Sequence, residues 1–536
     1  MTRTTITVAI AISAALSACS RTEPANNASP AGTASKTAAT AAPRTCESLA
    51  SLTLPNTTIS AAEAVAAGAF KAPGPAFGPA ADYTRLPAFC RVQGSIKPTS
   101  DSDIRFEVWL PTESWNGKFM QTGNGGAAGA IVYTSLADAL AHGYAAAHTD
   151  PGHTGGGGIG DFAWATGHPE KLTDFAYRAV HELTVVGKAV TNERYGKEPE
   201  RSYWDGCSTG GRQGLKEAQR YPEDYDAIVA GAPANNWSGL MGLSILIQRN
   251  LSGPEGLSPA KVGVLTEAAI AACDARDGVA DRVIGAPKLC TFDPSSTQCA
   301  AGKTEGCLTP TEVAAAKRVY AGVLDKAGTV LMPGTGPASE TLWALYASPQ
   351  FGIGTSYFRS VVFNDPSWDP ASSDIGDDVA RAEAQDGGAA KAMDPDLSAF
   401  VARGGRLIVY HGTADGLIPY GNSVNYFESV VAKLGADAVK DHVALYLVPG
   451  MSHCAGGEGA SAIDWIGALE AFDRGGHPPS SIAASHPATP APGLPGAPAP
   501  PPSKAFTRPV CPYPQLAKYK GQGDETDAAS WQCAAQ

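Results

Sequence analysis

The chain has 536 residues, of which 43% are hydrophobic and 17% are charged, and its formal net charge at pH 7 is −12. Disordered chains have far fewer apolar residues, so this composition indicates a globular protein, long enough for two or three packed units. Phosphate binding needs a basic face, so the acidic balance and the lack of a basic cluster in the sequence exclude nucleic acid as a partner.

The first residues have the pattern of an export signal. Arg3 precedes an apolar run that is too short to span a bilayer, and Leu16-Ser17-Ala18-Cys19 closes it. This ending resembles a bacterial lipobox, so we expect residues 1–19 to be a lipoprotein-type signal peptide with Cys19 lipidated. An ordinary signal peptide with a chance cysteine is the alternative. We therefore expect an exported protein (an outer-membrane lipoprotein, or a periplasmic or secreted protein), with membrane contact only through the lipid anchor. Residues 20–44 predict a flexible linker.

Strand-like and helix-like runs alternate along much of the remaining chain. Strands are predicted at residues 104–110, 118–121, 144–148, 201–204, 227–230, 406–410 and 443–448, and helices at residues 175–195 and 212–220. Such alternation is typical of a parallel sheet with helices on its faces. We expect an α/β core formed by residues 45–233 and 396–536.

A candidate nucleophile follows the predicted strand at residues 201–204. Gly206-Cys207-Ser208-Thr209-Gly210 reads G-x-S-x-G between a strand and a helix, which is the context of a nucleophile elbow. Asp415 and His453 each follow a later predicted strand. The order Ser208, Asp415, His453 is that of an α/β-hydrolase, in which the histidine accepts the serine proton and the aspartate orients the imidazole. A surface or capping role for His453 is the alternative.

Cysteine usage also suits export. Ten cysteines remain after Cys19, and an even number in an exported protein indicates five disulfides. Pairs close in sequence suggest themselves, which leaves Cys207 and Cys454 as the fifth pair. A bond between them would bring Ser208 and His453 together; two unrelated cysteines, each bonded elsewhere, is the alternative. The expected bonds are Cys46–Cys90, Cys207–Cys454, Cys273–Cys290, Cys299–Cys307 and Cys511–Cys533.

An oxyanion that forms on the substrate needs two fixed N–H donors. One is expected to be the backbone N–H of Thr209, the residue after the nucleophile. The other is expected from Gly125 or Gly126, in a glycine-rich loop after the strand at residues 118–121.

The strand–helix alternation stops between residues 234 and 395. This aromatic-rich insertion lies in the chain between the nucleophile and the acid, so we expect a lid domain over the active site. Within it, three carboxylates lie in a tight turn, where oxygen ligands suit Ca²⁺ and two backbone carbonyls would complete the shell; a solvated acidic loop is the alternative. The expected ligands are Asp274, Asp277, Asp281 and the carbonyls of Val279 and Val283.

Several of these segments resemble the tannase and feruloyl esterase family. They are residues 206–214, the acidic loop at residues 274–281, residues 358–369 (FRSVVFNDPSWD) and residues 512–521, and the similarity extends from about Cys46 to Cys533. The resemblance implies a secreted serine carboxylesterase with an α/β-hydrolase core, a lid with a structural Ca²⁺ and the Cys207–Cys454 bond beside the triad. Members of the family cleave feruloyl and other hydroxycinnamoyl esters, galloyl esters or, in one branch, mono(2-hydroxyethyl) terephthalate.

The expected substrate is a small aromatic ester, and the protein is expected to be a monomer. In the terephthalate branch a glutamate follows the nucleophile and a phenylalanine stands at the position of Ile418, so Thr209 and Ile418 count against that activity. Ile418 and the lid aromatics Phe358, Phe363 and Trp368 are candidate substrate contacts, with core packing as the alternative for the aromatics. Alternatives of another class are an acyltransferase and an inactive surface binding module.

Overall fold

The structure, a computed structural model, describes residues 42–73, 82–155, 160–253, 256–348, 351–488 and 504–535. The chain divides into two compact units, residues 1–40 and 41–536, and all described residues belong to the second. The predicted signal peptide and most of the predicted linker at residues 20–44 lie outside the described residues. Among the described helices, none has the length and apolar character needed to cross a membrane.

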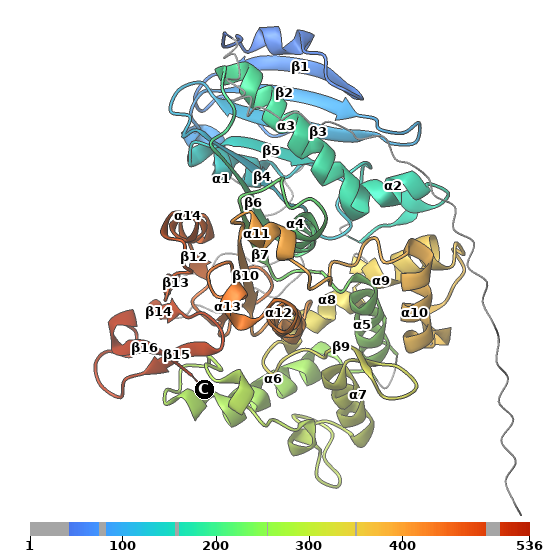
Figure 1. The fold of residues 1–536 in the computed structure, drawn as a ribbon. Coiled ribbons are helices and arrows are strands. Elements are labelled where there is room, and N and C mark those ends of the chain that lie inside the picture. Colours follow the sequence, from blue (N-terminus) through green and yellow to red (C-terminus); the bar gives the residue numbers. More distant parts are fainter. Residues whose placement is uncertain are drawn as a thin grey trace, which may run out of the picture. The chain divides into compact units, whose positions relative to one another are not determined.

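A nine-stranded sheet forms the core (Figure 1). From β5 to β11 neighbouring strands are parallel, whereas β1, β2, β3 and β5 pair antiparallel. The predicted, mostly parallel sheet is therefore confirmed, while β1 and β2 were not predicted. In spatial order the strands are β1 (Thr57–Val65), β2 (Phe89–Ile96), β3 (Ile104–Pro111), β5 (Ala145–Thr149), β4 (Lys118–Thr122), β6 (Arg201–Cys207), β7 (Ala227–Gly231), β10 (Arg406–Gly412) and β11 (Val443–Val448).

Helices cover both faces of the sheet, so successive residues of a strand pack in different apolar clusters. In β7, Ile228 packs in the cluster that contains Leu183 of α3 and Leu215 of α4, whereas Val229 packs in the cluster that contains Leu140 of α1. The predicted helix at residues 175–195 is α3, preceded by a π-helical turn (Asp174–Arg178). The first face carries α3 (Ala179–Tyr195), α4 (Thr209–Arg220), α12 (Tyr420–Leu434) and α13 (Ala436–Val439); the second carries α1 (Tyr133–Ala141) and α14 (Trp465–Gly475). α2 (Pro169–Thr173) precedes the π-helical turn.

The chain between β7 and β10 is mainly helical and has its own apolar core. Trp237, Trp343, Tyr357 and Phe358 are buried in a cluster distinct from those on the two sheet faces. Its elements are α5 (Trp237–Leu251), α6 (Pro259–Cys273), α7 (Pro310–Ala321), β8 (Val323–Leu324), β9 (Val330–Met332), α8 (Trp343–Ala347), α9 (Ile353–Tyr357), α10 (Ile375–Asp386) and α11 (Ser398–Ala402).

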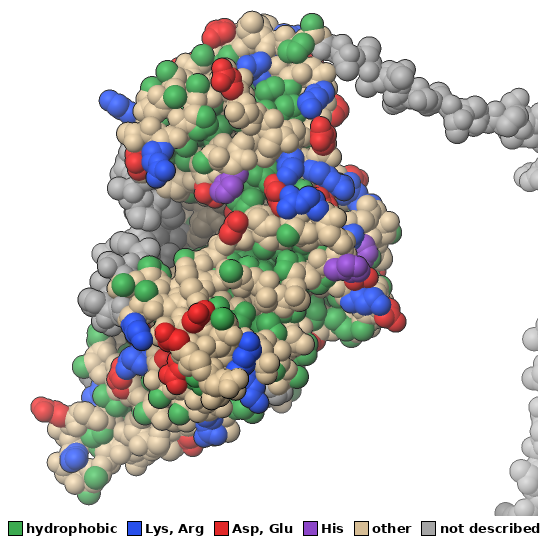
Figure 2. Space-filling model, turned by 90° about the vertical axis from the view of Figure 1, so that its left-hand side faces the viewer, with side chains coloured by type: hydrophobic (Ala, Val, Ile, Leu, Met, Phe, Trp, Pro, Cys, Tyr) green, Lys and Arg blue, Asp and Glu red, His purple; other side chains and the backbone are tan. Residues whose placement is uncertain are grey.

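The C-terminal part adds two small sheets to this core (Figure 1). One contains β12 (Ala462–Ile463), β13 (Ile482–His486) and β14 (Phe506–Val510), and the other is a hairpin of β15 (Gln515–Tyr519) and β16 (Trp531–Ala535). On the face drawn in Figure 2, acidic and basic side chains are interspersed.

Five disulfide bonds hold the described chain, and they are the five expected pairs. Four of them join cysteines that are neighbours in the cysteine order, and the fifth joins β6 to the loop after β11. They are Cys46–Cys90, Cys207–Cys454, Cys273–Cys290, Cys299–Cys307 and Cys511–Cys533. Disulfides in this number are typical of an exported protein.

Candidate active site

The turn between β6 and α4 holds Ser208 in a conformation that few residues adopt. Ser208 has φ 64° and ψ −120°, outside the usual regions for a residue other than glycine. Its N–H donates to the Gly231 carbonyl oxygen at 2.9 Å, which ties the turn to β7. A Cβ atom on Gly206 would lie 2.7 Å from the carbonyl carbon of Gly210, so the turn needs glycine there. The G-x-S-x-G sequence therefore folds as a strand–turn–helix elbow.

A disulfide bond connects this elbow to the loop after β11. Cys207, the last residue of β6, is bonded to Cys454, which lies 247 residues later, and their Cα atoms are 5.9 Å apart. Ser208 and His453 are the chain neighbours of these two cysteines, so the bond keeps both residues in one region. Among the described residues, no direct hydrogen bond joins Ser208 Oγ to His453. In ligand-free sites such bonds are often long and tighten only when substrate binds.

Asp415 and His453 form a buried hydrogen-bonded pair. His453 Nδ1 lies 2.7 Å from Asp415 Oδ2, and the Asp415 side chain is fully buried. Asp415 Oδ1 accepts hydrogen bonds from the N–H groups of Leu417 and Ile418, each at 2.9 Å. Burial raises the pKa of Asp415, but electrostatic attraction to His453 and the hydrogen bonds of His411 and His453 outweigh this effect and hold the pKa below its ordinary value. Asp415 is therefore an ionised acceptor that can orient the His453 ring.

A second imidazole, which the sequence analysis did not assign to the site, contacts the same carboxylate. His411 Nε2 lies 3.3 Å from Asp415 Oδ2 and 2.8 Å from the Ile418 carbonyl oxygen. A carbonyl only accepts hydrogen bonds, so Nε2 carries a proton. His411 Nδ1 lies 2.7 Å from Ser423 Oγ on α12, so both ring nitrogens have partners. His411, near the end of β10, is thus a further contact of the buried Asp415 carboxylate, and no spacing in the sequence indicated it.

The glycine-rich loop after β4 is bound to the first turn of α4. Gly210 N–H donates to the Asn124 carbonyl oxygen at 2.7 Å, and the Thr209 hydroxyl donates to the Gly126 carbonyl oxygen at 2.6 Å. Within the described residues, the N–H groups of Gly125, Gly126 and Thr209 donate to no protein acceptor. The loop and the start of α4 are therefore bonded to each other at the elbow, and these three N–H groups are available as donors.

Comparison with known proteins gives this arrangement its context. The family model described as tannase and feruloyl esterase matches residues 90–534. The chain belongs to this family. The protein is therefore a carboxylic ester hydrolase. The esterase is 36% identical to an uncharacterized esterase of Xanthomonas campestris over 91% of both chains, and 34% identical to a probable feruloyl esterase B-2 of Aspergillus terreus over 83% of this chain and 86% of that one.

Solved structures agree with the fold. Feruloyl esterase B from Aspergillus oryzae superposes on the esterase with a TM-score of 0.82 at 30% identity, covering 91% of this chain and 99% of that chain. The tannin acyl hydrolase of Aspergillus niger gives a TM-score of 0.70 at 24% identity, covering 90% and 92%. The predicted α/β-hydrolase fold is confirmed.

The esterase packs its candidate substrate contacts into the core of the insertion. Phe358 is fully buried, and its ring lies 5.3 Å from that of Trp368. Phe363 and Trp368 are stacked 5.2 Å apart and partly exposed, with the Arg381 guanidinium 4.5 Å from the centre of the Phe363 ring. Ile418 is 2% exposed. Packing in the apolar core of the insertion accounts for the positions of all four side chains, and their contact with a substrate stays a prediction.

The acidic loop of the esterase gathers negative charge that is only partly neutralised. Burial, together with the neighbouring carboxylates, raises the pKa of Asp277 to about 6, and burial raises the pKa of Asp274. Arg508 donates to Asp281 Oδ2 at 2.7 Å. The side chains of Asp277 and Asp281 accept hydrogen bonds from the N–H groups of Val279 and Val283, which turns the loop about the carboxylates.

Away from this loop, three side chains form a compact group of possible metal ligands. In the described chain, that group is His181, Glu217 and Asp224, whose ligand atoms all lie within 4.8 Å of one another. Glu217 and Asp224 are seven residues apart, but His181 lies 36 residues before Glu217 and joins them only through the fold, so no spacing in the sequence indicated this group.

Proposed function

We propose that this esterase hydrolyses esters of aromatic acids through an acyl intermediate on Ser208. The observation that supports it most is the 2.7 Å hydrogen bond from His453 to buried Asp415, beside the disulfide that ties His453 to the Ser208 elbow. A serine hydroxyl is a weak nucleophile by itself, and this arrangement supplies the base that it needs.

In the first half of the reaction, Ser208 Oγ attacks the ester carbonyl carbon while His453 Nε2 takes the hydroxyl proton. The imidazolium that forms is stabilised by Asp415, whose low pKa keeps it ionised. Collapse of the tetrahedral intermediate breaks the ester C–O bond, and His453 returns the proton to the leaving alcohol. Water then attacks the acyl-serine with His453 as the base, which releases the aromatic acid and restores Ser208.

The negative oxygen of each tetrahedral intermediate needs hydrogen-bond donors in fixed positions. We assign these to the N–H group of Thr209 and to one of Gly125 and Gly126. The hydrogen bond from the Thr209 hydroxyl to the Gly126 carbonyl oxygen couples the two sides of the hole, so they stay in register while charge develops.

The aromatic acyl group is proposed from the relatives named feruloyl esterase and tannin acyl hydrolase. The insertion between β7 and β10 would act as the lid and supply the walls of the acyl pocket, since aromatic side chains hold a flat ring well. Phe363 and Trp368, which are partly exposed, are better placed for this than the buried Phe358. Thr209 and Ile418 weigh against a terephthalate monoester.

The test compares Ser208→Ala with Ser60→Ala, an exposed serine on the edge strand β1. Both are assayed with methyl ferulate, methyl gallate and mono(2-hydroxyethyl) terephthalate. We expect Ser208→Ala to lose about 10³-fold or more in kcat and Ser60→Ala to retain the full rate. Release of ferulate or gallate by Ser208→Ala at the rate of the unaltered enzyme would refute the mechanism. Turnover of the terephthalate ester alone would refute the assignment to feruloyl or galloyl esters.

A structural Ca²⁺ in the acidic loop is also proposed. The residues fit, because Asp274 and Asp277 have raised pKa values from burial among carboxylates, and a hard divalent cation would relieve that repulsion. The ligands would be the carboxylates of Asp274, Asp277 and Asp281 and the carbonyls of Val279 and Val283, and the ion would hold the loop in place. We expect chelation to lower Tm and added Ca²⁺ to restore it; an unchanged melting curve in EDTA would count against the ion.

We propose that the esterase is exported as a monomer and anchored through a lipid on Cys19. Mass spectrometry of the N-terminal peptide, compared between the natural chain and a Cys19→Ala variant, tests the anchor, and light scattering tests the monomer. An unmodified Cys19 would leave an ordinary signal peptide as the explanation of residues 1–19.

A further inference from the structure

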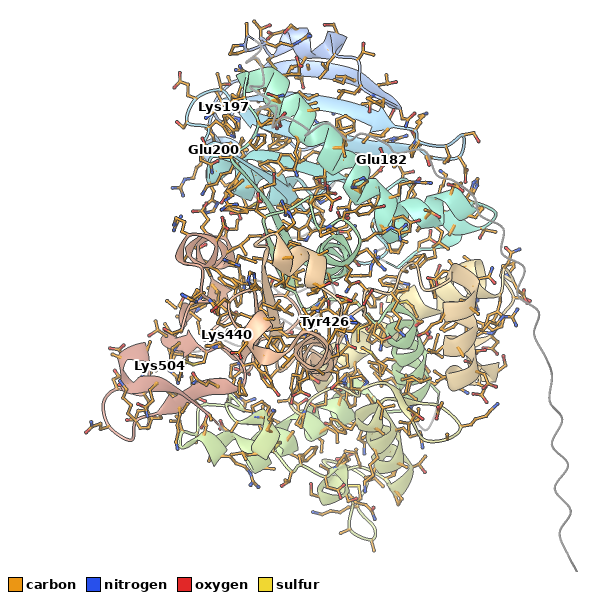
Figure 3. The ribbon with its side chains drawn as sticks, in the orientation of Figure 1. Glu182, Lys197, Glu200, Tyr426, Lys440 and Lys504 are labelled. Carbon is orange, nitrogen blue, oxygen red and sulfur yellow. A yellow bond between two sulfur atoms is a disulfide. The ribbon has the colours of Figure 1, made fainter. Side chains whose placement is uncertain are left out.

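Three titratable side chains meet on the face of the sheet that α3 and α4 cover. His181 lies on α3 beside Glu182, which Figure 3 labels; Glu217 lies on α4, and Asp224 on the turn that leads into β7. Their candidate ligand atoms all lie within 4.8 Å of one another. Glu217 follows the start of α4 by eight residues, about 12 Å along the helix axis. The group is therefore separate from the nucleophile elbow at the beginning of that helix.

Glu217 is the member that the surrounding protein does not satisfy. The residue is 1% exposed, and within the described residues Oε1 and Oε2 have no N–H donor or hydroxyl as a partner; the polar group beside them is the carboxyl group of Asp224. Burial of an ionised carboxylate without donors is unfavourable, because the charge loses its hydration and gains no hydrogen bond in exchange. Glu217 therefore needs either a proton or a cation.

The cationic side chains nearby are bonded elsewhere. The Lys188 ammonium donates to the main-chain carbonyl oxygen of Asp224. The Arg220 guanidinium lies 4.0 Å from the centre of the Tyr177 ring and donates to the Tyr221 hydroxyl at 3.2 Å. Neither contacts the oxygens of Glu217, so these cations do not explain why two carboxylates are buried side by side.

His181 adds an imidazole nitrogen to the carboxylates of Glu217 and Asp224. His181 Nδ1 lies 2.6 Å from Asp224 Oδ2, and the ring stacks on Tyr221 with 3.8 Å between centres. The His181 side chain is 29% exposed and that of Asp224 is 9% exposed, so solvent reaches the group from the His181 side. One imidazole nitrogen and two carboxylate oxygens form a donor set suited to zinc and similar divalent ions, with water in the remaining position.

We propose that His181, Glu217 and Asp224 bind one divalent transition metal ion, with Zn²⁺ as the best match to these donors. Binding would take the neutral imidazole and both carboxylates, and would release any proton held by the group to solvent. The ion would link α3, α4 and the turn before β7. Since α4 begins at the elbow, the ion would stabilise the helix on which Ser208 is mounted, without touching the substrate.

The test uses the full-length enzyme, stripped with a chelator, dialysed and titrated with Zn²⁺ by calorimetry. Glu217→Gln preserves the shape of the side chain and removes its charge. Glu182→Gln on the neighbouring position of α3 is the matched control, and Asp277→Asn removes a carboxylate of the acidic loop. We expect one Zn²⁺ equivalent in the unaltered enzyme and in both controls, and at least tenfold weaker binding in Glu217→Gln.

Melting temperature gives a second reading. Zn²⁺ should raise the Tm of the unaltered enzyme and not that of Glu217→Gln. If Glu217→Gln does not fold, the half-exposed His181→Gln replaces it, with the same expectation. The proposal is overturned if Glu217→Gln binds Zn²⁺ like the unaltered enzyme. It is equally overturned if the unaltered enzyme takes up no Zn²⁺; a higher melting temperature of Glu217→Gln would then identify a carboxyl pair sharing a proton.

Discussion

Removal of the Cys207–Cys454 bond should lower kcat at a temperature at which the enzyme stays folded. The bond closes a loop of 247 residues, which in the chain-entropy relation corresponds to about 5.5 kcal/mol at 25 °C as an upper bound. The loop contains two further disulfides, which reduce this value. Unfolding residues 41–536 involves an entropy of about 1 kcal/mol/K, so Tm should fall by about 5 °C or less. The Cys511–Cys533 bond, with a separation of 22 residues, gives about 3.4 kcal/mol and about 3 °C by the same relations.

The two double variants, Cys207→Ser/Cys454→Ser and Cys511→Ser/Cys533→Ser, therefore form a matched pair with similar losses of stability. We expect kcat on a soluble ester at 25 °C, below both melting temperatures, to fall by about 10²-fold in the first, because a misplaced base loses alignment with the nucleophile. The second should stay within about twofold of the unaltered enzyme. Equal kcat values in the two variants would show that the bond does not position His453.

Three further outcomes are expected. Asp415→Asn should lower kcat by about 10⁴-fold with little change in Tm, since the amide cannot hold the imidazole in the required tautomer; a loss below tenfold would contradict this. Thr209→Val removes the hydroxyl that donates to the Gly126 carbonyl oxygen and should lower kcat by about tenfold. Thr209→Ser keeps a hydroxyl and should retain the kcat of the unaltered enzyme. The pKa of Asp277 is raised above its ordinary value to about 6 in the folded protein, so its stabilising effect is present below about pH 4 and is lost as pH rises through about 6. In EDTA, Tm should therefore fall over this range, and Asp277→Asn should flatten the change.

Much of the core could be predicted from the sequence because its signals are local. The strand at residues 227–230 is a run of apolar residues between turns, and the elbow is a five-residue pattern between a strand and a helix. The order of Ser208, Asp415 and His453 follows from strand ends alone. The apolar strand runs can be recognised because a parallel strand that is buried on both faces of the sheet needs apolar residues along its whole length.

The features that were missed depend on contacts between distant segments. β1 has an irregular pattern of half-exposed alanines and threonines, so neither alternation nor an apolar run identified it. The bond from Thr209 to Gly126 and the contact of His411 with Asp415 depend on side-chain directions that no spacing specifies. The packing of Phe358 as a buried core residue depends on how the helices of the insertion meet.

The pairing pattern of the cysteines also bears on how the enzyme is made. Four bonds join cysteines that are consecutive in the chain. Cys207 bonds to Cys454 instead, and four other cysteines are synthesised between these two. An oxidant acting during synthesis would first join Cys207 to Cys273, and only thiol exchange can correct that error. Formation of the Cys207–Cys454 bond should therefore require a disulfide isomerase. A recombinant host that oxidises cysteines but lacks an isomerase should yield protein with Cys207 bonded to the wrong cysteine.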